Sequence, residues 1–423
     1  MQDCDLIIIH AAELVTCASD GKPKRGAAMR ELGTIKDGAV AIADGRIVGV
    51  GETAAILPAF EADRVINAEG RVVCPGFVDP HTHIVYAGDR LDEFEMKIRG
   101  ADYLEILTGG GGIISTVKKT RAASADELIE QGLARLDKML ACGTTACEIK
   151  TGYGLDAAAE LKMLDVIAEL DKSHAIDIVP TFLAAHAVPP EHKGDPDVYV
   201  DEICGTMLAA AWEWFEGSHF FGRVPFFCDV FCEFGAYSLE QSRRIIERAR
   251  ELGFGIKAHV DQFTNLGGSR LAIASGAASI DHLDAISDSE VAELADSETI
   301  GVVIPTENFN GGKTQFANAR KMIDAGCAIA LSTDYNPGSA PCPSQPMAMA
   351  IACRYQKLLP AEVLNAATIN AAFSIGLGET QGSIEVGKHA DMLICDFTDY
   401  RQLAYEFGGD QVRNVIKNGA VCY

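Results

Sequence analysis

Two histidines spaced two residues apart give the strongest chemical signal in the chain. His81 and His83 lie in the segment Asp79–His83, directly after the apolar run Val72–Val78. Side chains two positions apart on a strand point to the same side, so the two imidazoles could bind one metal ion. A His-x-His pair is common, and two unrelated polar residues at a strand end are the alternative. The pair therefore needs further ligands from elsewhere in the chain.

Three other polar residues stand at or just after the ends of later apolar runs: His259, His282 and Asp334. Taken singly, either histidine would more often be a hydrogen-bonded structural residue than a ligand. If the runs are parallel strands of one barrel, however, their ends converge on one site. Imidazoles with a carboxylate suit zinc or iron better than magnesium or calcium, which prefer oxygen ligands alone.

Such a site is typical of hydrolases. A zinc or iron ion can lower the pKa of a bound water toward about 7 and so supply hydroxide at neutral pH. A carboxylate and an imidazole beside the metal ion can then move the protons. The residue types alone thus predict metal-dependent hydrolysis.

The elements that would position these residues alternate between apolar strands and amphipathic helices, which is the pattern of a (β/α)₈ barrel. The expected strands are Val72–Val78, Thr144–Lys150, Ile176–Leu183, Phe226–Glu233, Gly255–His259, Ser279–His282, Gly301–Pro305 and Ala328–Ser332. Three capping boxes predict helix starts, at Ser124 with Glu127, Ser238 with Gln241 and Ser287 with Glu290.

The sequence pattern differs at both ends of the chain, where it predicts short strands joined by tight turns. The expected strands are Leu6–Ile9, Gly38–Ala43, Arg46–Val50, Ala390–Cys395 and Val412–Cys422. We expect the two termini to share one small, discontinuous β-sandwich. The predicted domains are therefore residues 1–70 and 381–423 for the sandwich and 71–380 for the barrel.

Composition excludes several other classes of protein. The chain has 423 residues, 48% of them hydrophobic, which excludes a disordered protein. Its 36 Lys and Arg against 60 Asp and Glu give a net charge of −24, so nucleic acid and anionic membranes are not expected partners. The acidic start MQDCDLIII and the lack of an apolar run of about 20 residues predict a cytoplasmic protein. The 13 cysteines never form CxxC, and we expect most to be reduced core residues.

Several ordered segments extend the histidine and aspartate pattern along nearly the whole chain. Beside PGFVDPHTH (75–83), they are AGDR (87–90), GGGGIISTVKKTRAAS (109–124), EIKTGYGLD (148–156), AAHAVPPE (184–191), DVFCE (229–233), HVDQ (259–262) and TDYNPGS (333–339). With the flanking β-sandwich, this sequence resembles the amidohydrolase superfamily of metal-dependent hydrolases. Within that superfamily it is most similar to the imidazolonepropionase family.

The resemblance implies hydrolysis of the ring amide of 4-imidazolone-5-propanoate to N-formimidoyl-L-glutamate, in histidine degradation. It also implies one metal ion, zinc or iron, held by His81, His83, His259 and Asp334. The residues that it places around substrate and product are Arg90, Tyr153, His186, Gln262, Asn336, Gly338 and Ser339. Arg90 is our first choice for binding the propanoate carboxylate, since a guanidinium fork suits that group. A homodimer is the expected assembly.

For catalysis we expect two residues to share the proton and charge transfers. His282 would polarise the ring carbonyl or orient the hydroxide, and Asp334 would take the proton of the water and pass it to the departing ring nitrogen. Many members of the family carry Glu where this chain has Gln262, and a neutral amide cannot act as a base. We therefore expect Gln262 to bind the ring by hydrogen bonds.

Two other classes of function stay open. A deaminase of the cytosine or guanine type uses the same barrel, but typically protonates the ring with a Glu at the position of Gln262 and has no clear use for Arg90. A scaffold that has lost catalysis is a further alternative, although all four ligand positions are filled here. The glycine run Gly109–Gly112 is interpreted as a loop, either a mobile lid over the site or an ordinary connection.

Overall fold

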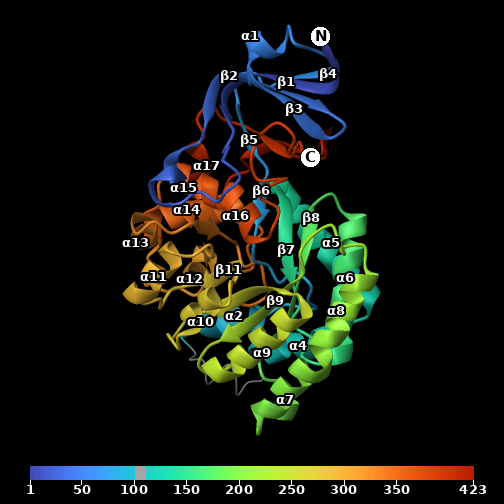
Figure 1. Ribbon diagram of the computed structural model, residues 1–423, viewed down its shortest axis with the longest axis vertical. Coiled ribbons are helices and arrows are strands. Elements are labelled where there is room, and N and C mark those ends of the chain that lie inside the picture. Colours follow the sequence, from blue (N-terminus) through green and yellow to red (C-terminus); the bar gives the residue numbers. More distant parts are fainter. Residues whose placement is uncertain (101–110) are drawn as a thin grey trace.

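A parallel eight-stranded barrel forms the larger part of the computed structural model, which describes residues 1–100 and 111–423 (Figure 1). Its strands are hydrogen-bonded in chain order: β6 (Phe77–Asp79), β7 (Thr144–Lys150), β8 (Asp177–Ala185), β9 (Phe227–Cys232), β10 (Gly255–Val260), β11 (Ser279–His282), β12 (Ile300–Val303) and β13 (Ile329–Leu331). The predicted (β/α)₈ architecture is thereby confirmed.

Side chains complete the barrel between its first and last strands. Asp79, at the end of β6, accepts hydrogen bonds from Ser332 Oγ at 2.6 Å and from the Thr333 amide at 3.2 Å. Farther along, Thr82 and Tyr335 form a parallel bridge. The segment that carries the paired histidines is therefore fixed against the segment that follows β13.

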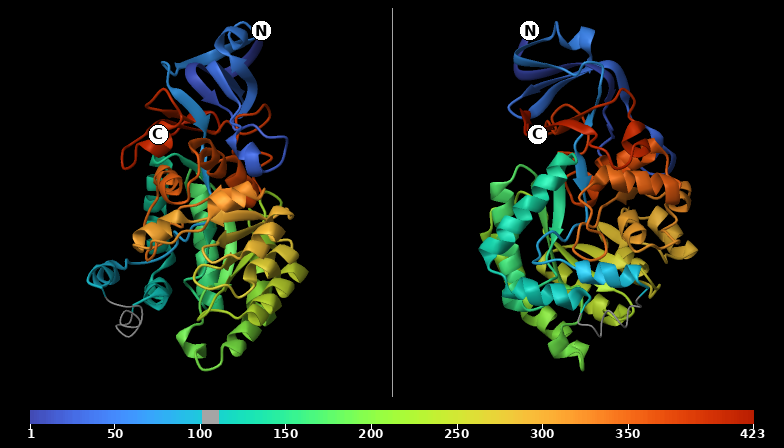
Figure 2. Two further views of the ribbon diagram at one scale, coloured as in Figure 1. Left: turned by 90° about the vertical axis from the view of Figure 1, so that its left-hand side faces the viewer. Right: turned by 180° about the vertical axis from the view of Figure 1, so that it is seen from behind.

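Helices surround the barrel strands, as both views in Figure 2 show. In chain order they are α2 (Leu91–Ile98), α4 (Ile113–Ala122), α5 (Ala125–Ala141), α6 (Ala157–Ser173), α7 (Pro196–Glu202), α8 (Leu208–Gly217), α9 (Leu239–Leu252), α10 (Gly268–Ala274), α11 (Asp288–Ala295), α12 (Pro305–Asn310), α13 (Ala319–Asp324), α14 (Gln345–Tyr355), α15 (Pro360–Ala366) and α16 (Ile369–Ser374). All three predicted capping boxes are present, at the starts of α5, α9 and α11. Among the described helices, none is long and apolar enough to cross a membrane.

Both termini build the second sheet, which lies at one end of the barrel (Figure 1). Its strands are β1 (Gln2–Val15), β2 (Thr34–Ala43), β3 (Arg46–Glu52), β4 (Phe60–Asn67), β5 (Val72–Pro75), β14 (Met392–Cys395), β15 (Val412–Lys417) and β16 (Ala420–Val421), with the short helices α1 (Thr53–Ile56) and α17 (Gln402–Tyr405) beside them in sequence. One core cluster contains both Ile42 of β2 and Met392 of β14, so the two ends of the chain share a core. The shared terminal sheet is thereby confirmed.

The predicted single strand Val72–Val78 is wrong, because the structure divides it at Gly76. Residues before the glycine form β5, which pairs with β1 and β14 in the terminal sheet. Residues after it form β6, which pairs with β7 in the barrel. A Cβ atom at Gly76 would lie 2.3 Å from Thr145 Oγ1, so only glycine lets the chain pass β7 this closely. The domain limits 1–70, 71–380 and 381–423 stay predictions.

A buried lysine joins the two sheets. Lys417 of β15 donates to Asp177 of β8 at 2.6 Å and to Asp391, beside β14, at 2.7 Å. The side chains of Lys417 and Asp391 are only 3% and 4% exposed. This ammonium therefore neutralises carboxylates from both parts of the molecule.

Replacing Lys417 by methionine is expected to lower the free energy of unfolding by about 3 kcal/mol, because removing one partner of a buried ion pair leaves an uncompensated charge. Urea unfolding would measure the change. Lys36→Met is a matched control, since the Lys36 side chain is 75% exposed beside Glu13 and its loss should cost under about 1 kcal/mol. Equal effects of the two substitutions would contradict the role of Lys417.

Candidate metal centre

Five polar side chains meet at the carboxyl ends of four barrel strands. His81 and His83 follow β6, His259 belongs to β10, His282 ends β11 and Asp334 follows β13. All five are 0–3% exposed. His282 and Asp334 have left-handed backbones, with φ of 84° and 50°, a conformation that costs energy in residues other than glycine and often occurs at functional sites.

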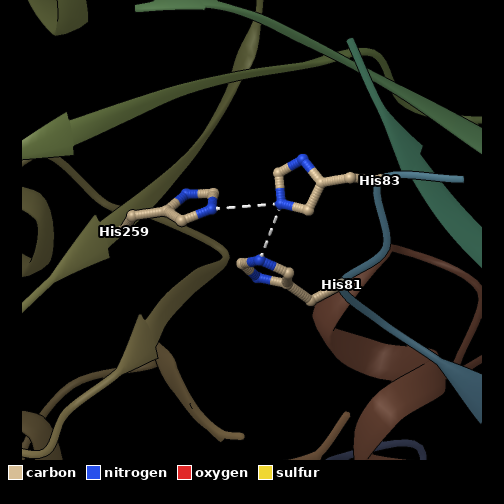
Figure 3. Close-up of side chains that lie close together, drawn as sticks. All are labelled: His81, His83 and His259. Carbon is tan, nitrogen blue, oxygen red and sulfur yellow. Dashed lines mark hydrogen bonds between the residues drawn. The ribbon is translucent and has the colours of Figure 1, made fainter. Parts of the chain in front are cut away.

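His81, His83 and His259 lie close enough together to share an ion, and Asp334 lies beside two of them. The Nε2 atoms of His81 and His83 are 3.2 Å apart, and those of His83 and His259 are 3.4 Å apart (Figure 3). Asp334 Oδ1 lies 3.6 Å from the Nε2 atoms of both His81 and His83. Neighbouring ligands of a tetrahedral zinc ion are roughly 3.4 Å apart, given metal–ligand distances near 2.1 Å. The structure thus brings together all four predicted ligands.

Carboxylates set the tautomers of two of these imidazoles. His81 Nδ1 lies 2.6 Å from Asp281 Oδ2, and His259 Nδ1 lies 3.0 Å from Asp229 Oδ1. Because carboxylates accept, each Nδ1 carries the proton and each Nε2 presents a lone pair. Nε2 of His83 could donate a proton to Nε2 of His81 or to Nε2 of His259, but not to both. In at least one of the two close pairs, two nitrogen lone pairs would therefore point at each other and repel. A cation between the nitrogens removes that repulsion, and the donor set fits zinc or iron.

Burial keeps the imidazoles of His81 and His83 uncharged. Desolvation holds the pKa values of His81 and His83 well below the usual value, and neighbouring cationic groups lower them further. Neutral histidine is the form that binds metal ions, so the site is prepared for a ligand role.

His282 lies beside the four without a fixed hydrogen bond. Its ring centroid is 5.4 Å from that of His81 and 5.3 Å from that of His259. Its Nδ1 is buried and has no partner among the described residues. Desolvation holds its pKa well below the usual value, so the imidazole is neutral and free to contact a substrate.

Tyr153 and His186 cover one side of the cluster. The His186 ring stacks on that of His83, with centroids 4.8 Å apart and planes 15° apart, and the Tyr153 ring lies 5.9 Å from His83. His186 Nδ1 donates to the carbonyl of Gly152 at 3.1 Å, which leaves Nε2 as an acceptor. Both predicted substrate-binding residues therefore lie beside the histidine cluster.

Arg90 is held by a neighbouring carboxylate. Its Nε and Nη2 atoms donate to the two oxygens of Glu93 at 2.8 and 2.5 Å, and Glu93 also accepts from the amide of Gly112 at 2.7 Å. A Cβ atom at Gly338 would lie 1.9 Å from Arg90 Nη1. Glu93 thus holds the Nε and Nη2 edge of the guanidinium, while Nη1 faces Gly338 in the loop after β13.

Asn336 shapes that loop. Its amide donates to the Asp334 carbonyl at 2.7 Å and to Ser339 Oγ at 2.9 Å, and its oxygen accepts from the amides of Gly338 and Ser339. These contacts fix the conformation of residues 334–339. Gln262 is half-buried in the bend after β10 and makes no hydrogen bond with any described residue.

Sequence reasoning missed a set of charged side chains inside the barrel, beside the histidines. They are Glu148, Lys150, Asp229, Lys257 and Asp281. The signal was present, because charged residues in otherwise apolar buried strands are unusual and need partners. Of the predicted glycine loop, Gly109 and Gly110 lie outside the described residues, and Gly112 directly precedes α4.

A hollow of about 720 Å³ lies elsewhere, lined by residues of α14, α15 and α17 and by Asp399 and Arg401, which precede α17. None of the predicted site residues borders it. Its lining residues form no cluster of metal ligands, so the strand ends of the barrel are the better candidate for the active site.

Fold and site together define a metal-dependent hydrolase of the amidohydrolase class, and the amidohydrolase family profile matches residues 233–422. The crystal structure of an adenosine deaminase from Xanthomonas campestris with bound zinc superposes with a TM-score of 0.75, covering 99% of this chain and 93% of that one. At 20% identity this likeness shows the fold alone.

Full-length relatives identify the family. The imidazolonepropionase of Chloroflexus aggregans is 53% identical over 422 residues, covering 100% of this chain and 99% of that protein. The imidazolonepropionase of Herpetosiphon aurantiacus is 49% identical, covering 100% and 98%. The chain belongs to the imidazolonepropionase family, and the predicted family is confirmed.

Proposed function

We propose that this protein hydrolyses the ring amide C–N bond of 4-imidazolone-5-propanoate and releases N-formimidoyl-L-glutamate. The observation that carries the proposal is the convergence of His81, His83, His259 and Asp334 in a chain 53% identical to an imidazolonepropionase. A zinc or iron ion held by these four residues supplies Lewis acidity, which acidifies water near neutral pH.

The chain's own residues bind and orient the substrate. Arg90 binds the propanoate carboxylate with its free edge, and Tyr153 donates to the same group. His186, Gln262 and Ser339 hydrogen-bond the ring, while Asn336 and Gly338 keep the loop after β13 in place. These contacts hold the ring carbonyl toward the four ligands.

Two residues move charge and protons during ring opening. His282, which is neutral and lacks a partner on Nδ1, donates a hydrogen bond to the ring carbonyl oxygen as negative charge develops there. Asp334 takes the proton from the attacking water and delivers it to the departing ring nitrogen. The C–N bond breaks, the carbonyl carbon becomes a carboxylate and the formimidoyl group stays on nitrogen.

The proposal also covers the identity of the metal ion, the assembly and the cellular location. Metal analysis of the purified protein would decide between zinc and iron, since three imidazoles and a carboxylate suit both. A homodimer and a cytoplasmic location are also proposed, and sedimentation and cell fractionation would test them.

Product identity tests the function directly. Purified, metal-loaded protein is mixed with freshly generated 4-imidazolone-5-propanoate, and the product is identified by mass spectrometry against the spontaneous decay. We expect N-formimidoyl-L-glutamate to form faster than in the absence of protein. Metal-loaded protein that leaves the imidazolone intact but releases ammonia from cytosine or guanine would favour a deaminase instead.

Replacing Gly338 by alanine is expected to raise KM at least about tenfold and leave metal content unchanged. The added Cβ would lie 1.9 Å from Arg90 Nη1, so the guanidinium must move away from the position where it binds the carboxylate. Gly194→Ala is the control, because a Cβ at Gly194 meets nothing within 4 Å. Steady-state kinetics would compare the two, and an unchanged KM in Gly338→Ala would argue against Arg90 as the carboxylate ligand.

A further inference from the structure

The buried charged cluster inside the barrel contains more acids than bases. Its members are Glu148 and Lys150 of β7, Asp229 of β9, Lys257 of β10 and Asp281 of β11, each 0–1% exposed. Two lysines thus face three carboxylates in a space without water contact. Buried charges are costly unless each is paired, so the position of each lysine matters.

Lys150 differs from Lys257 in what it touches. Lys150 Nζ lies 2.7 Å from Asp229 Oδ2 and 3.6 Å from Asp281 Oδ2. These are the two carboxylates that hold Nδ1 of His259 and of His81. Both lysines also contact Glu148 Oε2, Lys150 at 2.8 Å and Lys257 at 3.1 Å, and Lys257 donates in addition to the Pro80 carbonyl at 2.7 Å. Among the described lysines, only Lys150 lies within 4 Å of both histidine-bound carboxylates.

We infer that Lys150 is a positioning residue for the metal site, a single ammonium that orients both carboxylates and through them the metal-binding nitrogens of His81 and His259. Its charge offsets both histidine-bound carboxylates as well as Glu148, and its hydrogen bond to Oδ2 fixes Asp229 so that Oδ1 faces His259. Removing a group that orients a metal ligand without touching the metal ion typically weakens metal affinity 10- to 100-fold. The inference rests on the proposed metal site, but its test measures metal binding and not hydrolysis.

The experiment compares Lys150→Met with Lys257→Met, which removes an equally buried lysine from the same cluster. Zn²⁺ affinity is measured by competition with a chromophoric chelator, and circular dichroism confirms folding. We expect Lys150→Met to bind Zn²⁺ about 10- to 100-fold more weakly than the unsubstituted protein. Lys257→Met should change the affinity less than threefold. The visible absorption of bound Co²⁺ should also change only in Lys150→Met, since it reports ligand geometry.

A double variant covers the case in which Lys150→Met does not fold. Glu148→Gln with Lys150→Met keeps the net charge of the cluster, and Glu148 holds none of the ligand histidines. We expect this double variant to bind Zn²⁺ at least 10-fold more weakly than Glu148→Gln alone. The inference is overturned if a folded variant lacking Lys150 binds Zn²⁺ within threefold of its reference, or if Lys257→Met loses as much affinity. Failure of ring hydrolysis with normal Zn²⁺ binding would instead count against the proposed function.

Discussion

Replacing Asp334 by alanine is expected to slow the opening of 4-imidazolone-5-propanoate by about 10²- to 10⁴-fold, the range that a positioned acid–base group contributes. The Asp334 carboxylate is 5% exposed and lies 3.6 Å from the Nε2 atoms of His81 and His83. It is therefore the residue of the site that can both bind the metal ion and carry the proton. Initial rates of imidazolone loss, with metal content measured in parallel, would check this.

The unusual backbone of Asp334 requires a control. Its φ of 50° is left-handed, and alanine tolerates that conformation less well than aspartate. Asp44 has the same φ of 50° in an exposed turn, so Asp44→Ala shows the effect of backbone strain without a site role. Asp334→Asn keeps a residue that accepts the left-handed region but removes the charge. More than a tenth of the normal rate in Asp334→Asn would rule out the proton-carrying role.

Much of the barrel could be predicted because its strands are short apolar runs between clear turn signals. The predicted bounds of β7 (Thr144–Lys150) and β11 (Ser279–His282) agree with the structure at both ends. The ends of such strands also locate the site, since polar residues there must converge when the strands are parallel. Residues more than 250 positions apart, such as His81 and Asp334, could therefore be grouped from sequence.

The terminal sheet was harder to predict, for two physical reasons. β4 (Phe60–Asn67) was not predicted, because it contains several exposed charged residues and no apolar run, although it pairs with β1 along its length. The break at Gly76 was also hidden, because residues 72–78 form a nearly continuous apolar run. Only the close approach of Thr145 shows why the chain changes sheets at that glycine.

The partners of the site residues could not be predicted where they depend on strand order. Lys150 and Asp229 are 79 residues apart, and their contact requires the strands β7 and β9 to face the same interior. The pairing of Arg90 with Glu93 is different, since three residues along a helix start bring them together. The spacing of three residues is therefore enough to predict this ion pair from the sequence.

Replacing His282 by asparagine is expected to lower kcat by about 10²- to 10⁴-fold while metal content stays near normal. Asparagine tolerates the left-handed backbone at this position, where φ is 84°, and no hydrogen bond to His282 Nδ1 is lost among the described residues. The loss would therefore reflect the missing imidazole and not a damaged strand end. His10→Asn is a matched control, because His10 also has a left-handed backbone, with φ of 58°, but lies exposed in the terminal sheet. Steady-state kinetics and metal analysis of both variants would show whether the His282 imidazole contributes to kcat. A kcat for His282→Asn within tenfold of normal would mean that the carbonyl oxygen is stabilised by another group.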